Sequence, residues 1–218
     1  MNQTKIYIEG NIGSGKSEFI RFLHELGFTV IQEPVKIWEE IGILVEFYKD
    51  PKRWAYTFQS LAFATRLSET CSTINNINNT NTIIMERSIY TDRNCFTELQ
   101  VEFGNMTKME YDTYLAWYNL MEIKFRDEIK ADFIIYLRTT PEICYERIKK
   151  RSRNGESSIG MEYLRALHDK HEKWLSAGVE GTKIITVDVS QDMDEETHKK
   201  FTKQIINEIL GPTNPDHA

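Results

Sequence analysis

The sequence predicts a doubly wound α/β fold with a mainly parallel sheet. Short apolar runs alternate with longer segments of helical periodicity over most of the 218 residues. The first apolar run, 5–9, leads into a glycine-rich loop and then into a helix. Neither a repeat nor a linker interrupts the pattern, so we expect one domain over residues 1–210 and a frayed tail over 211–218.

The glycine-rich loop is the most specific local signal in the chain. Residues 10–17 read GNIGSGKS, a complete phosphate-binding loop of the GxxxxGK[ST] form. Its glycines allow backbone N–H groups to turn inward around a polyphosphate, and the N-terminus of the helix over 16–26 adds positive charge. We expect Lys16 to reach the β- and γ-phosphates of a nucleotide and the Ser17 hydroxyl to ligate Mg²⁺. The predicted nucleotide-binding residues of the loop are Gly10, Asn11, Ile12, Gly13, Ser14, Gly15, Lys16 and Ser17.

A carboxylate follows the second predicted strand. Gly27 is placed to end the first helix, and the run 28–31 is apolar and extended. Pro34 cannot donate to a strand ladder, so the strand stops and Glu33 lies at its carboxyl end. Because the phosphate loop lies at the same edge of a parallel sheet, we expect Glu33 to face it.

The next region is predicted to be helical and rich in aromatic residues. One or two short helices over 35–50 carry Trp38 and Tyr48, and a longer helix runs over 51–74 with Pro51 in its first turn. One stripe of the long helix contains two polar and two apolar side chains, and it lies either at a solvated margin or against a ligand. The residues of this stripe are Gln59, Ala62, Phe63 and Arg66.

A second acidic element follows the third predicted strand. After an asparagine-rich loop over 74–81, the apolar run 82–85 ends in Glu86-Arg87-Ser88. This is similar to the strand-plus-acid element that positions Mg²⁺ in phosphate-loop enzymes. We expect a helix over 89–98, which carries Asp92 and Phe96.

The second half of the chain continues the same alternation. A long helix over 111–129 carries an aromatic stripe, which is typical of a core or a subunit interface. The remaining predicted elements are a strand over 132–137, a helix that starts at Thr140-Pro141, a helix over 161–175, a strand over 183–188 and a closing helix over 195–210.

A basic run lies near the end of the helix that starts at Pro141. Arg147, Arg151 and Arg153 belong to it, and the polar segment 154–158 follows. Such a run is either a solvated helix face or a lid that closes over phosphates, and the intact phosphate loop favours the lid.

Composition limits the classes of partner. The net charge is −6 at pH 7, which argues against a nucleic-acid surface. No apolar stretch is long enough to span a membrane, and no targeting segment is visible. The three cysteines are far apart in the chain and include no CxxC pair, as expected for reduced thiols in a cytoplasmic protein.

Taken in this order, the motifs resemble those of the deoxynucleoside kinase family over nearly the whole chain. The resemblance rests on the phosphate loop, Glu33-Pro34-Val35, Trp54 with Phe58-Gln59, Glu86-Arg87-Ser88 with Asp92, and the stretch from Arg147 to Glu156. It implies ATP as the phosphate donor, Mg²⁺ as the cofactor, a homodimer, and transfer of the γ-phosphate to the 5′-hydroxyl of a deoxynucleoside.

The resemblance also implies roles for individual residues. Glu33 would be the base at the 5′-hydroxyl, and Arg87 would contact the same region and the transferred phosphate. Glu86 and Ser17 would hold Mg²⁺, and Gln59 would bond the nucleobase. The further implied contacts are Trp38 and Phe96 around the base, Tyr48 and Glu156 at the 3′-hydroxyl, Arg147, Arg151 and Arg153 in the lid, and Gln191, Asp192 and Met193 near the donor base. Met193 departs from the family, which often has an aromatic residue there.

Two other functions fit part of the sequence. A nucleoside monophosphate kinase such as thymidylate kinase shares the loop and the lid, but its acceptor phosphate needs a cation near Glu33, and no arginine flanks that residue in the chain. A nucleotide sensor would need the loop without the other elements. A broad-specificity or thymidine kinase is an alternative within the family.

The expected base preference depends on three residues, Ala62, Arg66 and Asp92. We expect an Arg66–Asp92 pair at the far wall of the pocket, since either charge alone would be costly there. The alternative is an ion pair unrelated to the ligand. A carboxylate at that wall accepts a hydrogen bond from an exocyclic amino group, and the bulk of Arg66 crowds a thymine methyl. Deoxycytidine, deoxyadenosine or deoxyguanosine is therefore expected to be favoured over thymidine.

Overall fold

A five-stranded parallel sheet forms the centre of the protein. The computed structural model describes residues 3–76, 81–151 and 159–211. Within them, the strand order is β2-β3-β1-β4-β5, and every neighbouring pair is parallel. The strands are β1 (Thr4–Glu9), β2 (Thr29–Ile31), β3 (Thr82–Glu86), β4 (Phe133–Arg138) and β5 (Lys183–Asp188). The predicted α/β class is confirmed, and the sheet is wholly parallel over these residues.

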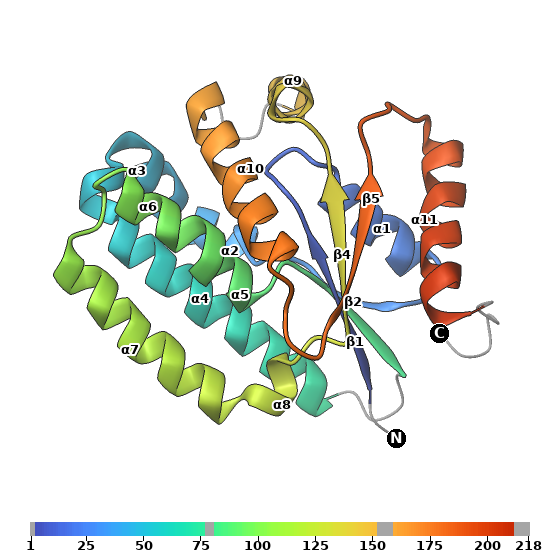
Figure 1. Ribbon diagram of the computed structural model, residues 1–218, viewed down its shortest axis with the longest axis horizontal. Helices are drawn as coiled ribbons and strands as arrows, with labels where there is room; N and C mark the ends of the chain where they lie inside the picture. The colour runs from blue at the N-terminus through green and yellow to red at the C-terminus, as the bar shows by residue number, and fades with distance from the viewer. Residues whose placement is uncertain (1–2, 77–80, 152–158, 212–218) are drawn as a thin grey trace.

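Helices cover both faces of the sheet (Figure 1). The first and last helices, α1 and α11, pack on one face, α4, α7 and α10 lie on the opposite side, and α9 lies beyond the carboxyl end of β4. The helical segments before β4 are α1 (Lys16–Glu25), α2 (Val35–Ile41), α3 (Ile43–Lys49), α4 (Pro51–Asn76), α5 (Ile89–Thr91), the π-helical turn η1 (Asp92–Thr97), α6 (Glu98–Glu102), α7 (Lys108–Lys124) and α8 (Arg126–Ile129). Those after β4 are α9 (Pro141–Arg151), α10 (Met161–Ser176) and α11 (Glu195–Leu210).

The central strand β1 is buried on both faces, as expected for a parallel sheet between helical layers. Ile6 and Ile8 pack in one apolar cluster with Phe19 of α1. Tyr7 points to the opposite cluster, which includes Ile134 of β4. This alternation keeps β1 rigid, and the loop that follows it starts from a fixed position.

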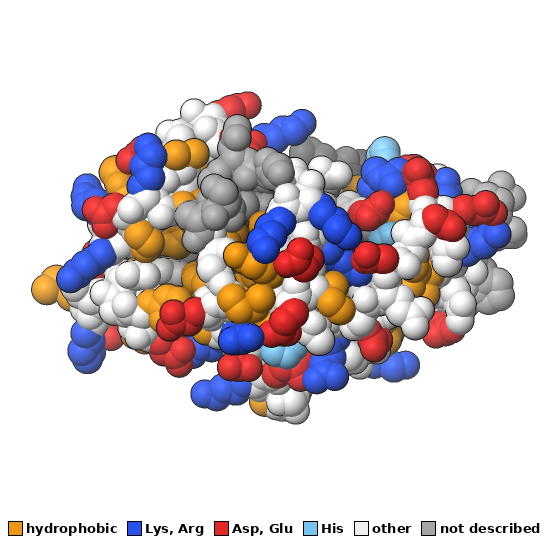
Figure 2. Space-filling view, turned by 90° about the horizontal axis from the view of Figure 1, so that it is seen from above, with side chains coloured by type: hydrophobic (Ala, Val, Ile, Leu, Met, Phe, Trp, Pro, Cys, Tyr) orange, Lys and Arg blue, Asp and Glu red, His pale blue; other side chains and the backbone are white. Residues whose placement is uncertain are grey.

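The strand order brings three polar segments to one edge of the sheet. After β1 the chain continues to β2 and β3, which lie on one side of β1 in the sheet. It then crosses to β4 and β5 on the other side, so the direction of winding changes next to β1. Ligands bind at such a switch point, outside the carboxyl ends of the strands. Figure 2 looks onto the molecule from above in the view of Figure 1, and basic and acidic side chains are interspersed over this face.

Two predicted helices differ from the structure. The helix expected over 111–129 begins earlier, at Lys108, because Thr107 and Glu110 form a capping box, and Phe125 interrupts it before α8. The helix expected over 89–98 is π-helical over residues 92–97 and continues as α6. Neither the early start nor the π turn follows from hydrophobic periodicity.

Some sequence predictions fall outside the described residues. Arg153, Glu156 and the rest of the segment 152–158 are among them, as is the tail over 212–218.

Candidate active site

The phosphate loop turns from β1 into α1 with its lysine folded back on the loop. Lys16 is buried, and its Nζ donates to the carbonyl oxygens of Gly10 at 3.0 Å and Asn11 at 2.7 Å. Gly13 has φ +82°, and a Cβ there would lie 2.5 Å from the carbonyl oxygen of Cys144 in α9. Glycine at this position is therefore required by conformation and by space.

The side chain of Asn11 stabilises this loop through two hydrogen bonds. Its Nδ2 donates to the carbonyl oxygen of Leu164 in α10 at 2.9 Å, and its Oδ1 accepts from the Ile12 N–H at 2.8 Å. The side chain of Asn11 is thus used to hold the loop in shape. Of the eight predicted loop residues, those on the cavity wall are Ile12, Gly13, Gly15, Lys16 and Ser17.

The hydroxyl of Ser17 and the carboxylate of Glu86 meet at the mouth of the loop. Ser17 Oγ donates to Glu86 Oε1 at 2.9 Å, and both residues line the cavity. One hydroxyl and one carboxylate beside a phosphate site fit Mg²⁺, which takes a few protein oxygens and keeps waters and substrate phosphates. Within the described residues, no group of three or more His, Cys, Asp or Glu could hold a metal ion alone.

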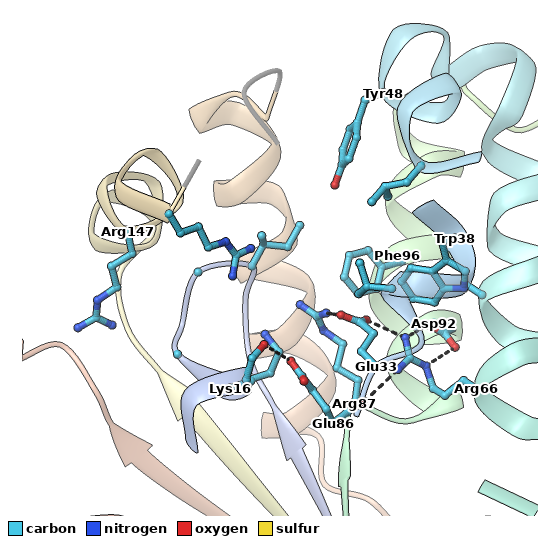
Figure 3. Close-up of a pocket in the computed structure, with 18 of the residues that line it drawn as sticks. Lys16, Glu33, Trp38, Tyr48, Arg66, Glu86, Arg87, Asp92, Phe96 and Arg147 are labelled. Atoms are coloured by element: carbon cyan, nitrogen blue, oxygen red, sulfur yellow. Dashed lines mark hydrogen bonds and ion pairs between the residues drawn. The ribbon is translucent and has the colours of Figure 1, made fainter. Parts of the chain in front are cut away.

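Glu33 sits between two guanidinium groups. Arg87 Nη1 lies 2.7 Å from both carboxylate oxygens, and Arg66 Nη2 donates to Oε1 at 2.9 Å (Figure 3). Burial raises the pKa of Glu33, but the charges of Arg87, Arg66 and Lys16 outweigh it and hold the pKa below the ordinary value of 4.5. The carboxylate is therefore ionised and fixed in orientation.

The pKa of Lys16 is lowered as well, but for a lysine a lower pKa favours the neutral form. Burial, followed by the nearby charge of Arg87, lowers the pKa of Lys16 from 10.5 to about 7. No carboxylate of the described residues forms an ion pair with the Lys16 ammonium group, and a bound polyphosphate would supply that anion.

The predicted Arg66–Asp92 pair is present and deeply buried. Arg66 Nε donates to Asp92 Oδ2 at 3.0 Å, while its Nη1 donates to the carbonyl oxygen of Glu86 at 3.0 Å. The side chains of Arg66 and Asp92 are 5% and 1% exposed, and both line the cavity. Of the two interpretations of the α4 stripe, the solvated margin is excluded for Gln59, Ala62 and Arg66, which are buried on the cavity wall.

Phe63, the fourth member of that stripe, lies elsewhere. It is buried against Tyr114 and Tyr118 of α7, with ring centroids 6.0 and 5.7 Å away, and it is absent from the cavity lining. Four residues advance an α-helix by about 40° beyond a full turn. Phe63 therefore lies at the edge of the stripe that is next to α7, while Gln59 lines the cavity.

Aromatic rings form the upper walls of a cavity of about 460 Å³. Trp38 packs edge-on against Phe58 at 5.3 Å, and the ring of Phe96 lies 5.0 Å from the Arg87 guanidinium carbon. Figure 3 shows Tyr48 extending toward the cavity from α3. Gln59 is buried, and its amide forms no hydrogen bond with a residue that the structure describes, so it is available to a ligand.

The α9 side of the cavity is basic. Arg147, Lys150 and Arg151 line it, and Arg147 Nη2 donates to Asp192 Oδ1 at 3.0 Å and to the carbonyl oxygen of Gln191 at 3.3 Å. Figure 3 shows Arg147 directed away from the Glu33–Arg87 pair. The structure thus places one expected lid residue, Arg147, against the loop after β5, and a second, Arg151, on the cavity wall. Met193 and Gln191 are absent from the lining.

Several lining residues were not found by sequence reasoning. Tyr163 of α10, Leu44 and Phe47 of α3, and Lys150 complete the wall. Lys150 lies within the basic run, so the run could have identified it as a lining residue. The other three occupy positions that the sequence pattern does not distinguish from ordinary apolar helix positions.

One sequence argument needs correction. Glu33 was expected to lack a neighbouring cation because no arginine flanks it in the chain. Arg66 and Arg87, from distant elements, pair with it directly. The absence of a cation is therefore not a reason to exclude a phosphorylated acceptor. Both guanidinium groups are already paired with carboxylates, however, which leaves an acceptor phosphate in competition with Glu33.

A phosphate loop that faces an ionised, doubly paired carboxylate across a half-enclosed cavity defines a phosphoryl-transfer site. Comparison with known proteins agrees with this geometry. Residues 6–211 match the family model described as deoxynucleoside kinase, so the chain belongs to the deoxynucleoside kinase family.

Individual relatives cover most of the chain. It is 43% identical to a fowlpox virus protein named "Probable deoxycytidine kinase", over 87% of this chain and 80% of that protein. It is 34% identical to human deoxycytidine kinase, over 95% and 91% of the two chains. It is 33% identical to the mitochondrial deoxyguanosine kinase of Xenopus laevis, over 81% and 74%.

Proposed function

We propose that this protein transfers the γ-phosphate of ATP to the 5′-hydroxyl of deoxycytidine, deoxyadenosine or deoxyguanosine, and accepts thymidine poorly. The observation that most strongly supports this proposal is the continuous network of ion pairs from Glu33 through Arg66 to Asp92. It connects the carboxylate opposite the phosphate loop with the far wall of the cavity, so one rigid set of charges serves both the reacting end and the base end of a nucleoside.

At the reacting end, Glu33 orients the 5′-hydroxyl and accepts its proton. Phosphoryl transfer has a loose transition state, so positioning and charge stabilisation matter more than nucleophilic push. A carboxylate with a lowered pKa is a weak base, which suits an acceptor that takes the proton late. Arg87 stabilises the charge of the transferred phosphate. Its contact with Glu33 and the 3.4 Å distance from its Nη2 to the Gly10 carbonyl oxygen support this role.

On the donor side, Lys16 and the loop amides hold the triphosphate. Ser17 and Glu86 would hold Mg²⁺, which would supply positive charge beside the phosphates of the nucleotide. Arg147 and Arg151 of α9 form the lid together with Arg153, which is outside the described residues, and the donor base lies near the loop 191–193.

At the base end, the Gln59 amide bonds the nucleobase between Trp38 and Phe96. Asp92 accepts from an exocyclic amino group, and Arg66 occupies the room that a thymine methyl would need. Tyr48, together with Glu156 outside the described residues, contacts the 3′-hydroxyl. A cavity of about 460 Å³ suits a small ligand.

The test is a product assay with ATP, Mg²⁺ and each of the four deoxynucleosides, with thymidine monophosphate as a separate acceptor. We expect deoxynucleoside 5′-monophosphates from the three amino-bearing bases. Diphosphate formation from thymidine monophosphate would instead establish a monophosphate kinase, and ATP binding without any product would establish a nucleotide sensor.

We further propose a cytoplasmic homodimer, acting as one domain over residues 1–210. Helix α7 supports the dimer, because Met109, Trp117, Leu120 and Ile123 on it are between 55% and 79% exposed. Large exposed apolar patches of this kind mark interaction surfaces. Within the described part of the chain, no helix combines the length and apolar content needed to cross a bilayer.

A further inference from the structure

Glu9 is a buried acid that none of the roles above uses. It is the last residue of β1, immediately before the phosphate loop, and it is 0% exposed. The neighbouring strand β3 ends at Glu86, which pairs in register with Ile8, the residue before Glu9. The Glu9 side chain therefore lies beside the turn that carries Arg87 and Ser88.

That turn has an unusual backbone. Of the described residues other than glycine, Arg87 alone has a positive φ, which is +62°. This left-handed conformation is unfavourable for a side chain of this size and persists only where surrounding contacts hold it. Two contacts do so. The Arg87 N–H donates to the Ile8 carbonyl oxygen at 3.0 Å, and Ser88 Oγ donates to Glu9 Oε1 at 2.7 Å.

We propose that Glu9 is a positioning residue, which anchors Ser88 and so holds Arg87 in the left-handed conformation that aims its guanidinium group at Glu33. The chain of contacts is short. Glu9 fixes the hydroxyl of Ser88, Ser88 follows Arg87, and Arg87 Nη1 holds both oxygens of Glu33 at 2.7 Å. Without the anchor, the turn relaxes toward an ordinary negative φ and the guanidinium group moves away from the reacting centre.

An uncharged side chain at position 9 that accepts the hydrogen bond from Ser88 is enough to anchor the turn. Burial raises the pKa of Glu9 from 4.5 to about 7, although the hydroxyls of Thr91 and Ser88 and the charge of Arg87 act in the opposite direction. In the structure Glu9 accepts a hydrogen bond from Ser88 Oγ at 2.7 Å, and a carboxyl group retains an acceptor oxygen whether it is ionised or protonated. Glutamine preserves that acceptor and the shape of the side chain, whereas alanine removes both.

The experiment compares Glu9→Gln, Glu9→Ala and the control Tyr7→Phe, and it rests on the proposed kinase activity. Tyr7 lies on the same strand, and its hydroxyl donates to the Ile129 carbonyl oxygen at 2.9 Å rather than to a residue of the turn. Tyr7→Phe therefore removes a buried hydrogen bond of β1 without touching Arg87. We expect Glu9→Ala to lower kcat by about 100-fold with little change in KM for the nucleoside, as misplacement of a catalytic group does. Glu9→Gln and Tyr7→Phe retain most of the parent kcat.

Amide hydrogen exchange supplies a readout that does not depend on activity. The Arg87 amide should exchange faster in Glu9→Ala than in the parent, Glu9→Gln or Tyr7→Phe, because its bond to Ile8 loosens with the turn. An unchanged kcat and Arg87 exchange rate in Glu9→Ala would overturn the proposal, as would a Glu9→Gln variant as impaired as Glu9→Ala.

If Glu9→Ala does not fold, Ser88→Ala removes the same bond from the other partner, and a parent-like kcat and exchange rate there would also overturn the proposal. A parent enzyme without activity on any nucleoside refutes the proposed function instead, and the exchange comparison still decides the role of Glu9.

Discussion

Arg66 and Glu33 form an ion pair, with Nη2 2.9 Å from Oε1, although they lie on different elements and 33 positions apart in the chain. The same guanidinium group pairs with Asp92. Specificity and catalysis are therefore coupled through one side chain, and a substitution at Arg66 acts at both ends of the nucleoside.

Opening the pocket to thymidine should cost catalytic rate. The parent enzyme should prefer the amino-bearing bases over thymidine by roughly 10²–10⁴ in kcat/KM, the range that mispaired buried polar groups impose. The double variant Arg66→Met with Asp92→Ala removes the bulk and the charge at the far wall, so thymidine should gain in relative kcat/KM. Its kcat should fall for every nucleoside, because Glu33 loses one of its two guanidinium partners.

The measurement is kcat/KM for the four deoxynucleosides on both proteins. Arg66→Met alone is the matched control. It leaves Asp92 buried without its partner and should lower the free energy of unfolding by about 3–5 kcal/mol. Thymidine as the best substrate of the parent enzyme would contradict this view of the pocket.

Lys16→Ala should abolish phosphoryl transfer while the fold remains intact. The ammonium group stabilises negative charge that grows on the transferred group, a loss of at least ~2.7 kcal/mol by analogy with oxyanion donors. Circular dichroism and a kinase assay test this, with Lys36→Ala on the exposed side of α2 as the control. A folded Lys16→Ala enzyme with near-parent turnover would refute the assignment.

Glu33→Gln should lower kcat by roughly 10²–10⁴ with a modest change in KM, because the amide keeps the shape but cannot accept the proton. Steady-state kinetics with the preferred nucleoside measures both constants. If KM alone changed, Glu33 would be a binding residue and the base would lie elsewhere.

Glu33 should also make stability depend on pH. Its pKa in the folded protein lies below the ordinary value of 4.5, so the ionised, paired carboxylate stabilises the fold above that value. This contribution is lost as pH falls below 4.5 toward the lowered pKa. At pH 7 we expect Glu33→Gln to be less stable than the parent by about 3 kcal/mol, since two buried guanidinium groups lose their anion.

Urea unfolding of both proteins across acidic and neutral pH measures this difference, which should shrink as pH falls. Glu39→Gln, an exposed carboxylate on α2, is the control and should follow the parent. A difference that stays constant with pH would show that Glu33 is not the titrating group.

The exposed apolar residues of α7 should hold the dimer together. Trp117→Glu with Leu120→Glu places charges in the patch and should shift the protein to a monomer in sedimentation velocity. Lys203→Glu on the exposed surface of α11 is the control and should leave the parent state unchanged. A parent protein that is already monomeric at the concentrations used would contradict the homodimer.

The sequence alone determined the features that depend on local order. The phosphate loop, the strand-by-strand alternation and the Glu86-Arg87-Ser88 turn are contiguous, and their residue types and spacing carry the physical requirement within a few positions. The Arg66–Asp92 pair was also predictable, because two charges on apolar helix faces need each other.

Only the tertiary structure determines which residues from distant segments of the chain contact one another. The order β2-β3-β1 places Glu33, Arg87 and the phosphate loop side by side, and no periodicity encodes that order. The pairing of Glu33 with two arginines depends on this arrangement. The packing of α4 against α7 is likewise a tertiary contact, and it places Phe63 against Tyr118 instead of on the cavity wall. The left-handed backbone of Arg87 is a property of its surroundings, since the chain accepts that conformation only where contacts such as Ser88–Glu9 stabilise it.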